Sequence, residues 1–265
     1  DVMITVYKHE IKLSLKSLLI WFACVGGMGF ACILLYSSMK GDMAAMAESF
    51  ASMGAFADAF GMSQLSIATL PGFYATEVGT IHGLGGAMFA AIMSICMLSK
   101  EEDAHTSEFL FSMPISRAKV VLSKWFSITT NIVLFNIMCV IVYAIGFIIL
   151  CEDIPVKEFA LYHGMQVLMQ IEIAAICYAI SAFVKKNKFG LGLGVVLLLY
   201  AYDLMARVIP DLSDYKLISP FSYANAADIL STGEVEVIAV LLGVVVLIGC
   251  MVMAFNGYIR RDLVS

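Results

Sequence analysis

Residues 99–124 read SKEEDAHTSEFLFSMPISRAKVVLSK, and this charged stretch separates two apolar runs that are each long enough to cross a bilayer. Ser99 followed by Glu102 has the spacing of a helix capping box, so a short helix is expected to begin there and to end before Pro114. Ser116 is placed to cap a second helix, which leads into the next apolar run. We interpret the stretch as an interaction surface at the membrane face, with an ordinary polar loop as the alternative.

The composition sets the class of protein. Apolar residues make up 61% of the 265 positions, and charged residues only 14%. A soluble domain has about 25% charged residues, so these proportions indicate a polytopic membrane protein. The formal net charge of -5 gives no basic surface for nucleic acid. We therefore expect the lipid bilayer, and no nucleic acid, among the partners of the chain.

Six segments have the roughly 20 apolar residues that a helix needs to cross the bilayer core. They lie at approximately 18–37, 73–98, 125–150, 161–184, 189–208 and 236–257. The expected fold is an all-α membrane protein whose single transmembrane domain comprises residues 1–265. Of the 16 Lys and Arg residues, twelve fall in one set of connections between spans and four in the other. Because cytoplasmic connections are the richer in Lys and Arg, both termini are predicted to lie in the cytoplasm, with the spans in the plasma membrane.

The residues before the first span have a helical pattern of their own. An apolar stripe recurs at helical spacing, and Lys8, Lys12 and Lys16 form a polar stripe beside it; the apolar positions are Ile4, Tyr7, Ile11, Leu15 and Leu18. The pattern predicts an amphipathic helix on the inner leaflet, whose lysines contact anionic headgroups. The alternative is that these residues are the start of the first span.

Two long outer connections are predicted to carry structure. A Met-rich amphipathic helix is expected at approximately 39–62, either as packing against the spans or a second copy, or as a lid over an exit path. Its apolar positions are Met39, Met43, Met46, Phe50, Met53, Ala57 and Phe60. The segment from Arg207 to Glu236 is expected to form a re-entrant or interfacial hairpin, with a helix starting at Ser219.

Polar residues inside the spans are candidates for a translocation path. A charge near the bilayer centre costs roughly 2.5 to 3.5 kcal/mol on insertion scales, so Glu172 is expected to face protein or water. The candidate path residues are Glu77, His82, Gln166, Gln170 and Glu172. Glu77 and His82 either pair with each other or line a vestibule, and Glu172 is either an interhelical contact or a contact for cargo or protons. Asp203 and Arg207, four residues apart, are expected to form an ion pair.

Enzyme chemistry has little support in the sequence. The chain has no GxxxxGK[ST] phosphate loop, and its seven Cys and four His residues have no metal-ligand or redox spacing. Tyr202 and Asp203 match the YD of intramembrane aspartyl proteases, but the GxG of Gly190–Gly194 lies upstream and carries no acid. We expect no catalytic residue, cofactor site or metal site in this chain.

The charged stretch resembles the cytoplasmic signature of the membrane subunits of ABC-2-type exporters, in which an acidic turn, a Thr-x-Glu and a Pro-x-Ser-Arg precede a Lys. The resemblance depends on Glu101, Glu102, Thr106, Glu108, Pro114, Ser116, Arg117 and Lys124. ISPFSYANAADI before the last span and YIRRDL near the end are weaker similarities. The resemblance implies six spans, an N-terminal elbow helix and a coupling helix in segment 99–124, where Glu101, Glu102, Thr106, Glu108, Pro114, Arg117 and Lys124 meet the ATPase.

The same resemblance implies partners and a class of cargo. The chain would pair with a second copy of itself or a paralogous permease, and two copies of a separate ATPase subunit would bind ATP and Mg. The long Met-rich outer connection departs from many members and favours those that export amphipathic peptides. Two other classes stay open: an ion-coupled secondary transporter that uses Glu172, and a membrane assembly protein without transport.

Overall fold

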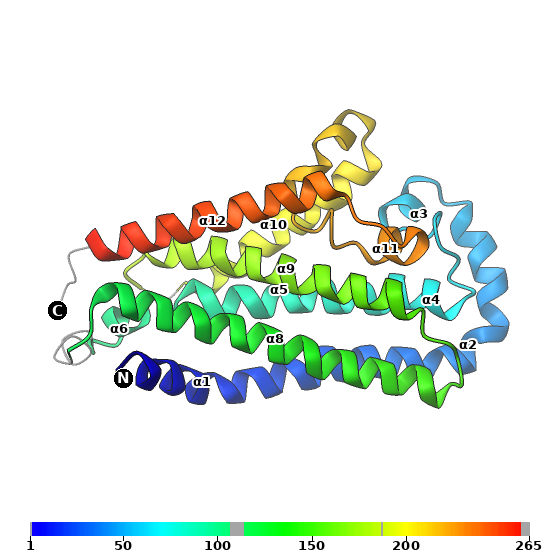
Figure 1. Cartoon of the computed structure of the whole chain (residues 1–265). Helices are drawn as coiled ribbons and strands as arrows, with labels where there is room; N and C mark the ends of the chain where they lie inside the picture. Colours follow the sequence, from blue (N-terminus) through cyan, green and yellow to red (C-terminus); the bar gives the residue numbers. More distant parts are fainter. Residues whose placement is uncertain (1, 107–113, 187, 261–265) are drawn as a thin grey trace.

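The computed structural model of the chain describes residues 2–106, 114–186 and 188–260, and in these residues every regular element is a helix (Figure 1). Six helical segments are long and apolar enough to cross a membrane, which confirms the predicted number of spans. They are Val2–Phe50, Leu70–Ile95, Arg117–Ile149, Val156–Ser181, Phe189–Val208 and Val237–Arg260. The fold is that of an all-helical, multi-pass membrane protein.

The first span is one long helix that begins near the N-terminus. It comprises α1 (Val2–Trp21), a π-helical turn (Phe22–Gly26) and α2 (Gly27–Ala51), with no break between them. α1 lies along α8 (Arg117–Ile149), since the Tyr7 and Thr130 hydroxyls are 3.0 Å apart. The prediction of a separate elbow helix is therefore not borne out, and these residues extend the first span.

The face of α1 that packs inward carries polar as well as apolar side chains. The buried positions are Val6, Glu10, Ser14 and Leu18, whereas Ile4 and Leu15 are 51% and 49% exposed. A helix in lipid turns apolar side chains outward and keeps polar ones against protein, so the exposure of Ile4 and Leu15 agrees with a stripe that faces the membrane, whereas Leu18 of the same stripe is buried. Lys8, Lys12 and Lys16 are exposed.

α5 (Gly79–Ile95) and α9 (Val156–Ser181) form the centre of the bundle (Figure 1). In each of these two spans 61% of the apolar window is buried, against 17% in α12 (Val237–Arg260). α5 and α9 approach closely because Gly86 has no side chain: a Cβ there would lie 2.3 Å from the Gln170 Nε2 atom. α10 (Phe189–Val208) packs on α5, and α12 packs on α9.

The helix that begins the connection between the second and third spans is short. α6 (Lys100–Asp103) is a single turn, and the Ser99 side chain does not cap it but donates a hydrogen bond to the Cys96 carbonyl. The predicted capping box is therefore wrong. The predicted cap at Ser116 is confirmed, because its hydroxyl accepts a hydrogen bond from the Lys119 amide at the start of α8.

The outer connections are broken into short pieces. The single helix predicted at 39–62 is wrong: α2 ends at Ala51, Gly54 has φ of +53°, and α3 is Ala55–Ala59. α4 (Leu70–Phe73) and a π-helical turn (Tyr74–Val78) then lead into α5. Before the last span lie a 3-10 helix (Pro210–Ile218) and α11 (Ala226–Thr232).

The start of α11 also corrects the sequence interpretation of residues 207–236. α11 is capped by Asn225, whose side chain accepts a hydrogen bond from the Asp228 amide, so the predicted start at Ser219 is wrong. The Ser219 hydroxyl instead donates to the Leu199 carbonyl of α10. The segment from Phe221 to Leu230 supplies most of the buried residues of this connection, and the 3-10 helix supplies none.

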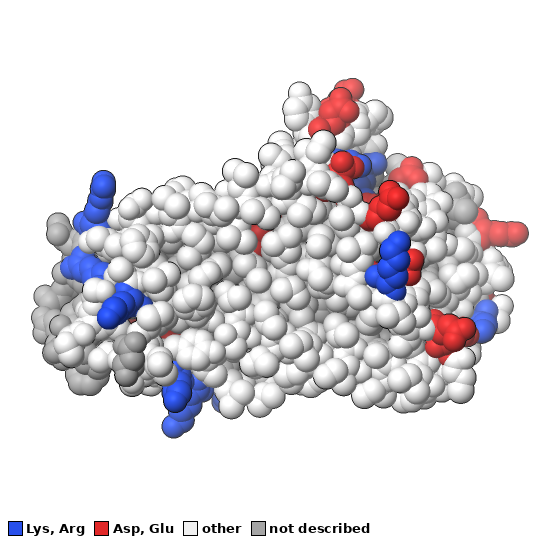
Figure 2. Space-filling view, viewed as in Figure 1, with Lys and Arg blue, Asp and Glu red and all other residues white. Residues whose placement is uncertain are grey.

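The two ends of the bundle differ in charge. Figure 2 shows that Lys and Arg side chains gather where α1 begins and α12 ends, whereas acidic side chains gather at the opposite end. We call these the basic end and the acidic end. The Arg117 guanidinium joins the start of α8 to the end of α12 at the basic end, by donating to the Ile259 carbonyl at 3.1 Å.

Candidate functional site

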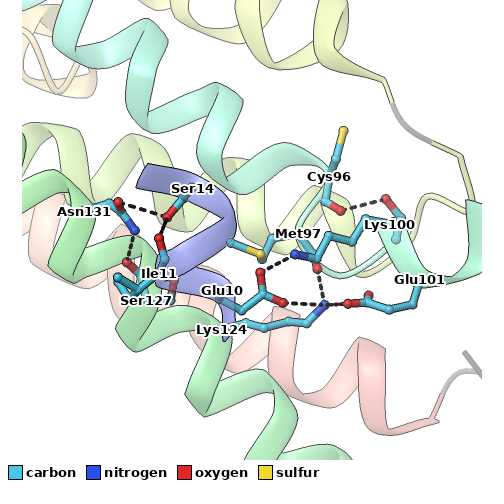
Figure 3. Close-up of polar contacts among 11 residues, drawn as sticks. Glu10, Ile11, Ser14, Cys96, Met97, Lys100, Glu101, Lys124, Ser127 and Asn131 are labelled. Carbon is cyan, nitrogen blue, oxygen red and sulfur yellow. Dashed lines mark hydrogen bonds and ion pairs between the residues drawn. The ribbon is translucent and has the colours of Figure 1, made fainter. Parts of the chain in front are cut away.

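Four charged side chains meet inside the basic end of the bundle, and we call them the charge cluster: Glu10, Lys100, Glu101 and Lys124. Figure 3 shows that they converge from α1, α6 and α8. The Lys124 side chain is 0% exposed, and its Nζ lies 2.5 Å from the Glu101 Oε1 and 4.0 Å from the Glu10 Oε1. Lys100 binds the other oxygen of Glu10. The one-turn helix α6 is thereby held to both α1 and α8.

Local structure explains why Lys124 tolerates full burial. Its ammonium also donates to the Met97 carbonyl at 2.6 Å, just beyond the end of α5, where carbonyls have no partner within the helix. Glu10 lies on the packing face of α1 beside Ser14. The cluster contains two acids and two bases, so opposite charges compensate one another away from water.

A second polar group lies beside the charge cluster and fastens α1 to α8 (Figure 3). The Ser14 hydroxyl lies 3.1 Å from the Asn131 Oδ1, and the Asn131 amide donates to the Ser127 carbonyl one turn earlier. Because these groups are buried, the Ser14–Asn131 hydrogen bond fixes the register of α1 on α8, while the bond to Ser127 orients the Asn131 side chain.

A third polar cluster lies deeper in the bundle, around His82 of α5. The His82 Nε2 donates to the Asn136 Oδ1 at 2.9 Å, and Asn136 donates to the Gln170 Oε1 at 2.6 Å, which links α5, α8 and α9. The Tyr143 hydroxyl lies 3.3 Å from the other His82 nitrogen. His82 therefore pairs with these residues and not with Glu77, which is exposed.

Glu172 faces a different neighbour from Gln170. Its Oε2 accepts a hydrogen bond from the Tyr223 hydroxyl at 2.6 Å, and a Cβ at Gly243 of α12 would lie 2.6 Å from the same oxygen. Burial, and then the nearby Glu172, raise the pKa of Tyr223, so its phenol keeps the proton that it donates. Gln166 donates to the Ala224 carbonyl at 2.8 Å. The candidate path residues are thus divided among separate contacts.

Comparison with known proteins gives the family. The sequence model described as "ABC-2 family transporter protein" matches residues 4–263, nearly the whole chain. The chain belongs to the ABC-2 transporter family. No curated protein matches it significantly. Membership and the six apolar helices together make it a membrane permease of an ABC transporter.

The structure divides the residues of the ABC-2 signature between interior and surface. Lys124 and Glu101 belong to the charge cluster, and Glu102 is 7% exposed. Thr106 and Pro114 are exposed, and Arg117 is half-buried against α12. Glu108 lies outside the described residues. The signature therefore does not form one continuous outer surface, and its contact with an ATPase stays a prediction.

Several polar residues of this permease were not recognised from the sequence. They are Glu10, Ser14, Lys100, Asn131, Asn136, Tyr143 and Tyr223. Asn131 and Asn136 interrupt a long apolar run, and a polar residue in such a run is the one signal that pointed to them. Among the residues that the structure describes, no group of three His, Cys, Asp or Glu side chains could hold a metal ion.

Proposed function

We propose that this ABC-2 permease is the membrane subunit of an ATP-driven exporter. It works as a dimer with itself or a paralogous permease, and two copies of a separate ATPase subunit bind ATP and Mg at its basic end. The cargo is amphipathic or hydrophobic, such as a peptide, a drug or a lipid-like molecule. The protein lies in the plasma membrane with both termini in the cytoplasm, which the concentration of Lys and Arg at the basic end supports.

The charge cluster is the observation that carries this proposal. It joins α6, which lies between the second and third spans, to α1 and α8 through ion pairs. A rigid element can transmit a nucleotide-driven movement into the spans, whereas a flexible loop cannot. The exposed parts of the signature, Thr106 and Pro114, together with Arg117 and Glu108, are the proposed ATPase contacts. Lys8, Lys12 and Lys16 are the proposed inner-leaflet contacts, at about 1 kcal/mol each.

The competing class is an ion-coupled secondary transporter in which Glu172 is the coupling residue. Glu172 is 3% exposed and hydrogen-bonded to Tyr223, so it already has a structural partner. This structural contact favours the exporter over the secondary transporter. In an exporter, Glu172 would pack against neighbouring residues or contact the cargo.

Energy coupling separates the two classes. In reconstituted vesicles, transport is expected to require ATP and the partner ATPase, and to survive collapse of the proton and sodium gradients. The Glu172→Gln variant is expected to keep ATP-dependent transport at an altered rate, because Gln still accepts the Tyr223 hydrogen bond. Transport by this chain alone, driven by an imposed gradient and lost in the Gln variant, would refute the proposal.

The proposed orientation is tested by labelling. In a variant without the native cysteines, a single Cys at Asp214 is expected to react with an impermeant thiol reagent added to intact cells, because this exposed residue lies at the acidic end. A Cys at Lys119, which is exposed near the start of α8, is expected to react only after lysis. Labelling of the Lys119 position in intact cells would contradict the cytoplasmic placement of the basic end.

A further inference from the structure

A small cavity lies in the acidic half of the bundle, apart from the charge cluster. It is bounded by α3, α5 and the π-helical turn before it, α9, α10, and the start of α11 with the residues that precede it, and its volume is about 50 Å³. On this scale one water needs roughly 10–15 Å³, so the cavity has room for a group of a few heavy atoms. It is too small for a whole amphipathic molecule, but it can hold the group at one end of such a molecule.

Two buried hydrogen-bond acceptors line this cavity. Gln166 is 2% exposed and donates its Nε2 to the Ala224 carbonyl, which leaves its Oε1 with no partner among the described residues. Asp203 is 3% exposed, and its Oδ2 accepts from Arg207 while its Oδ1 has no partner among them. Burying an acceptor without a donor costs about 1–3 kcal/mol, so two at one cavity suit a molecule that donates hydrogen bonds.

The other polar residues that line the cavity help to exclude some classes of ligand. The Thr80 hydroxyl donates to the Thr76 carbonyl, and the Asn225 oxygen accepts from the Asp228 amide, so both groups already have a partner within the protein. Two free oxygens are too few for Ca²⁺ or Mg²⁺, which take about six or more oxygen ligands.

Three aromatic residues also line the cavity, among small and aliphatic side chains: Phe60, Tyr200 and Phe221. The rings of Tyr200 and Phe221 pack edge to face, with their centroids 5.3 Å apart. Aromatic rings together with a carboxylate oxygen and an amide oxygen suit an ammonium group, which has three donors and is attracted to ring faces.

We propose that this cavity binds the primary ammonium group at the end of an alkyl chain, and that it is a contact for a cationic amphipathic cargo. The cargo role rests on the proposed transport function, whereas binding itself needs only this chain. Asp203 Oδ1 and Gln166 Oε1 accept hydrogen bonds from the ammonium group, and the aromatic rings cover its alkyl carbons.

Binding is tested with dansylcadaverine, which carries a primary ammonium on a five-carbon chain and fluoresces more strongly in apolar surroundings. The full chain in an uncharged detergent is expected to bind it at least about tenfold more tightly than its N-acetyl form, which keeps the dansyl group and the five-carbon chain but has no charge. Asp203→Asn and Gln166→Leu are each expected to weaken binding at least about tenfold. Asp211→Asn, the same change at an exposed residue outside the cavity, is expected to leave binding within about twofold of the wild type.

Gln166→Glu provides the control for misfolding, because both Gln166 variants lose the hydrogen bond to the Ala224 carbonyl and only Gln166→Glu keeps an acceptor at the cavity. It is expected to bind more tightly than Gln166→Leu. Equal affinity for the two probes, wild-type affinity in both cavity variants, or weak binding in Gln166→Glu as well as in Gln166→Leu would overturn the proposal. These measurements use neither ATP nor the ATPase. Their failure is therefore distinguishable from a failure of ATP-driven transport.

Discussion

Replacing Lys124 with methionine is expected to abolish ATP-driven transport and to lower the free energy of unfolding by about 3–5 kcal/mol. Methionine fills a similar space but leaves the Glu101 carboxylate, which is 15% exposed, without the cation 2.5 Å away. It also removes the donor to the Met97 carbonyl. A buried charge whose partner is removed keeps its desolvation cost and loses its compensation, so this single change weakens the attachment of α6 to α8.

The matched control is Lys119→Met, because Lys119 lies on the same helix and is exposed. It removes the same charge and is expected to change the free energy of unfolding by less than about 1 kcal/mol. Adding Glu101→Gln to Lys124→Met is expected to restore part of the lost stability, because no unpaired carboxylate remains at that position. Denaturant unfolding in detergent measures these differences, and Lys124→Met with wild-type stability would contradict the role of the charge cluster.

The same variants separate a structural role of the charge cluster from a coupling role. If the cluster transmits movement from the ATPase, the double variant is expected to regain stability without regaining transport, since α6 is no longer joined to α8 by an ion pair. The measurement is ATP hydrolysis and transport in the same vesicles, below the unfolding temperature. Full recovery of transport with stability would limit the cluster to a structural role.

The sequence was most informative where an interaction is local along the chain. Apolar runs of sufficient length predicted the six spans, because the cost of exposing backbone to lipid leaves few alternatives to a helix. The Ser116 cap joins residues three apart, and the Asp203–Arg207 pair joins residues four apart on one helix; both are present. Either interaction can be predicted without knowing which other helix lies nearby.

The sequence was misleading where the environment of a helix face decides the outcome. The spacing in α1 predicts an apolar stripe against the membrane, and Ile4 and Leu15 are exposed, but it does not predict that a face with Glu10 and Ser14 is buried. In water an apolar stripe marks the packing side, whereas in lipid polar side chains turn toward protein. Ser99 has the right spacing for a cap, but its ψ of -13° is helical and not the extended backbone of a capping residue.

Long-range pairs could not be predicted from one sequence. Glu10 and Lys100 are 90 residues apart, and Glu172 and Tyr223 are 51 apart. No local spacing connects them, because the packing of different helices decides which side chains meet. The charge cluster and the acceptors of the small cavity therefore required the structure, although the sequence alone places Lys124 in the ABC-2 signature, Gln166 among the candidate path residues and Asp203 in an ion pair.

At the acidic end, Arg207→Met is expected to lower the free energy of unfolding by about 3–5 kcal/mol. The Arg207 guanidinium binds the Asp203 Oδ2 at 2.9 Å and the Asp228 Oδ2 at 3.0 Å, and so joins α10 to α11. Asp203 is 3% exposed and would be left as a buried carboxylate without a cation. Asp228 has a side chain 34% exposed and would be hydrated, so the loss comes mainly from Asp203.

Two comparisons test this explanation of the Arg207 effect. Arg207→Met combined with Asp203→Asn is expected to recover most of the stability, whereas Arg207→Met with Asp228→Asn is expected to recover little. Lys157→Met removes an exposed cation and is expected to change stability by less than about 1 kcal/mol. Equal recovery with either second substitution would show that the number of charges at this end matters more than the burial of Asp203. Recovery confined to the Asp203→Asn combination would establish that the buried carboxylate beside the small cavity depends on Arg207.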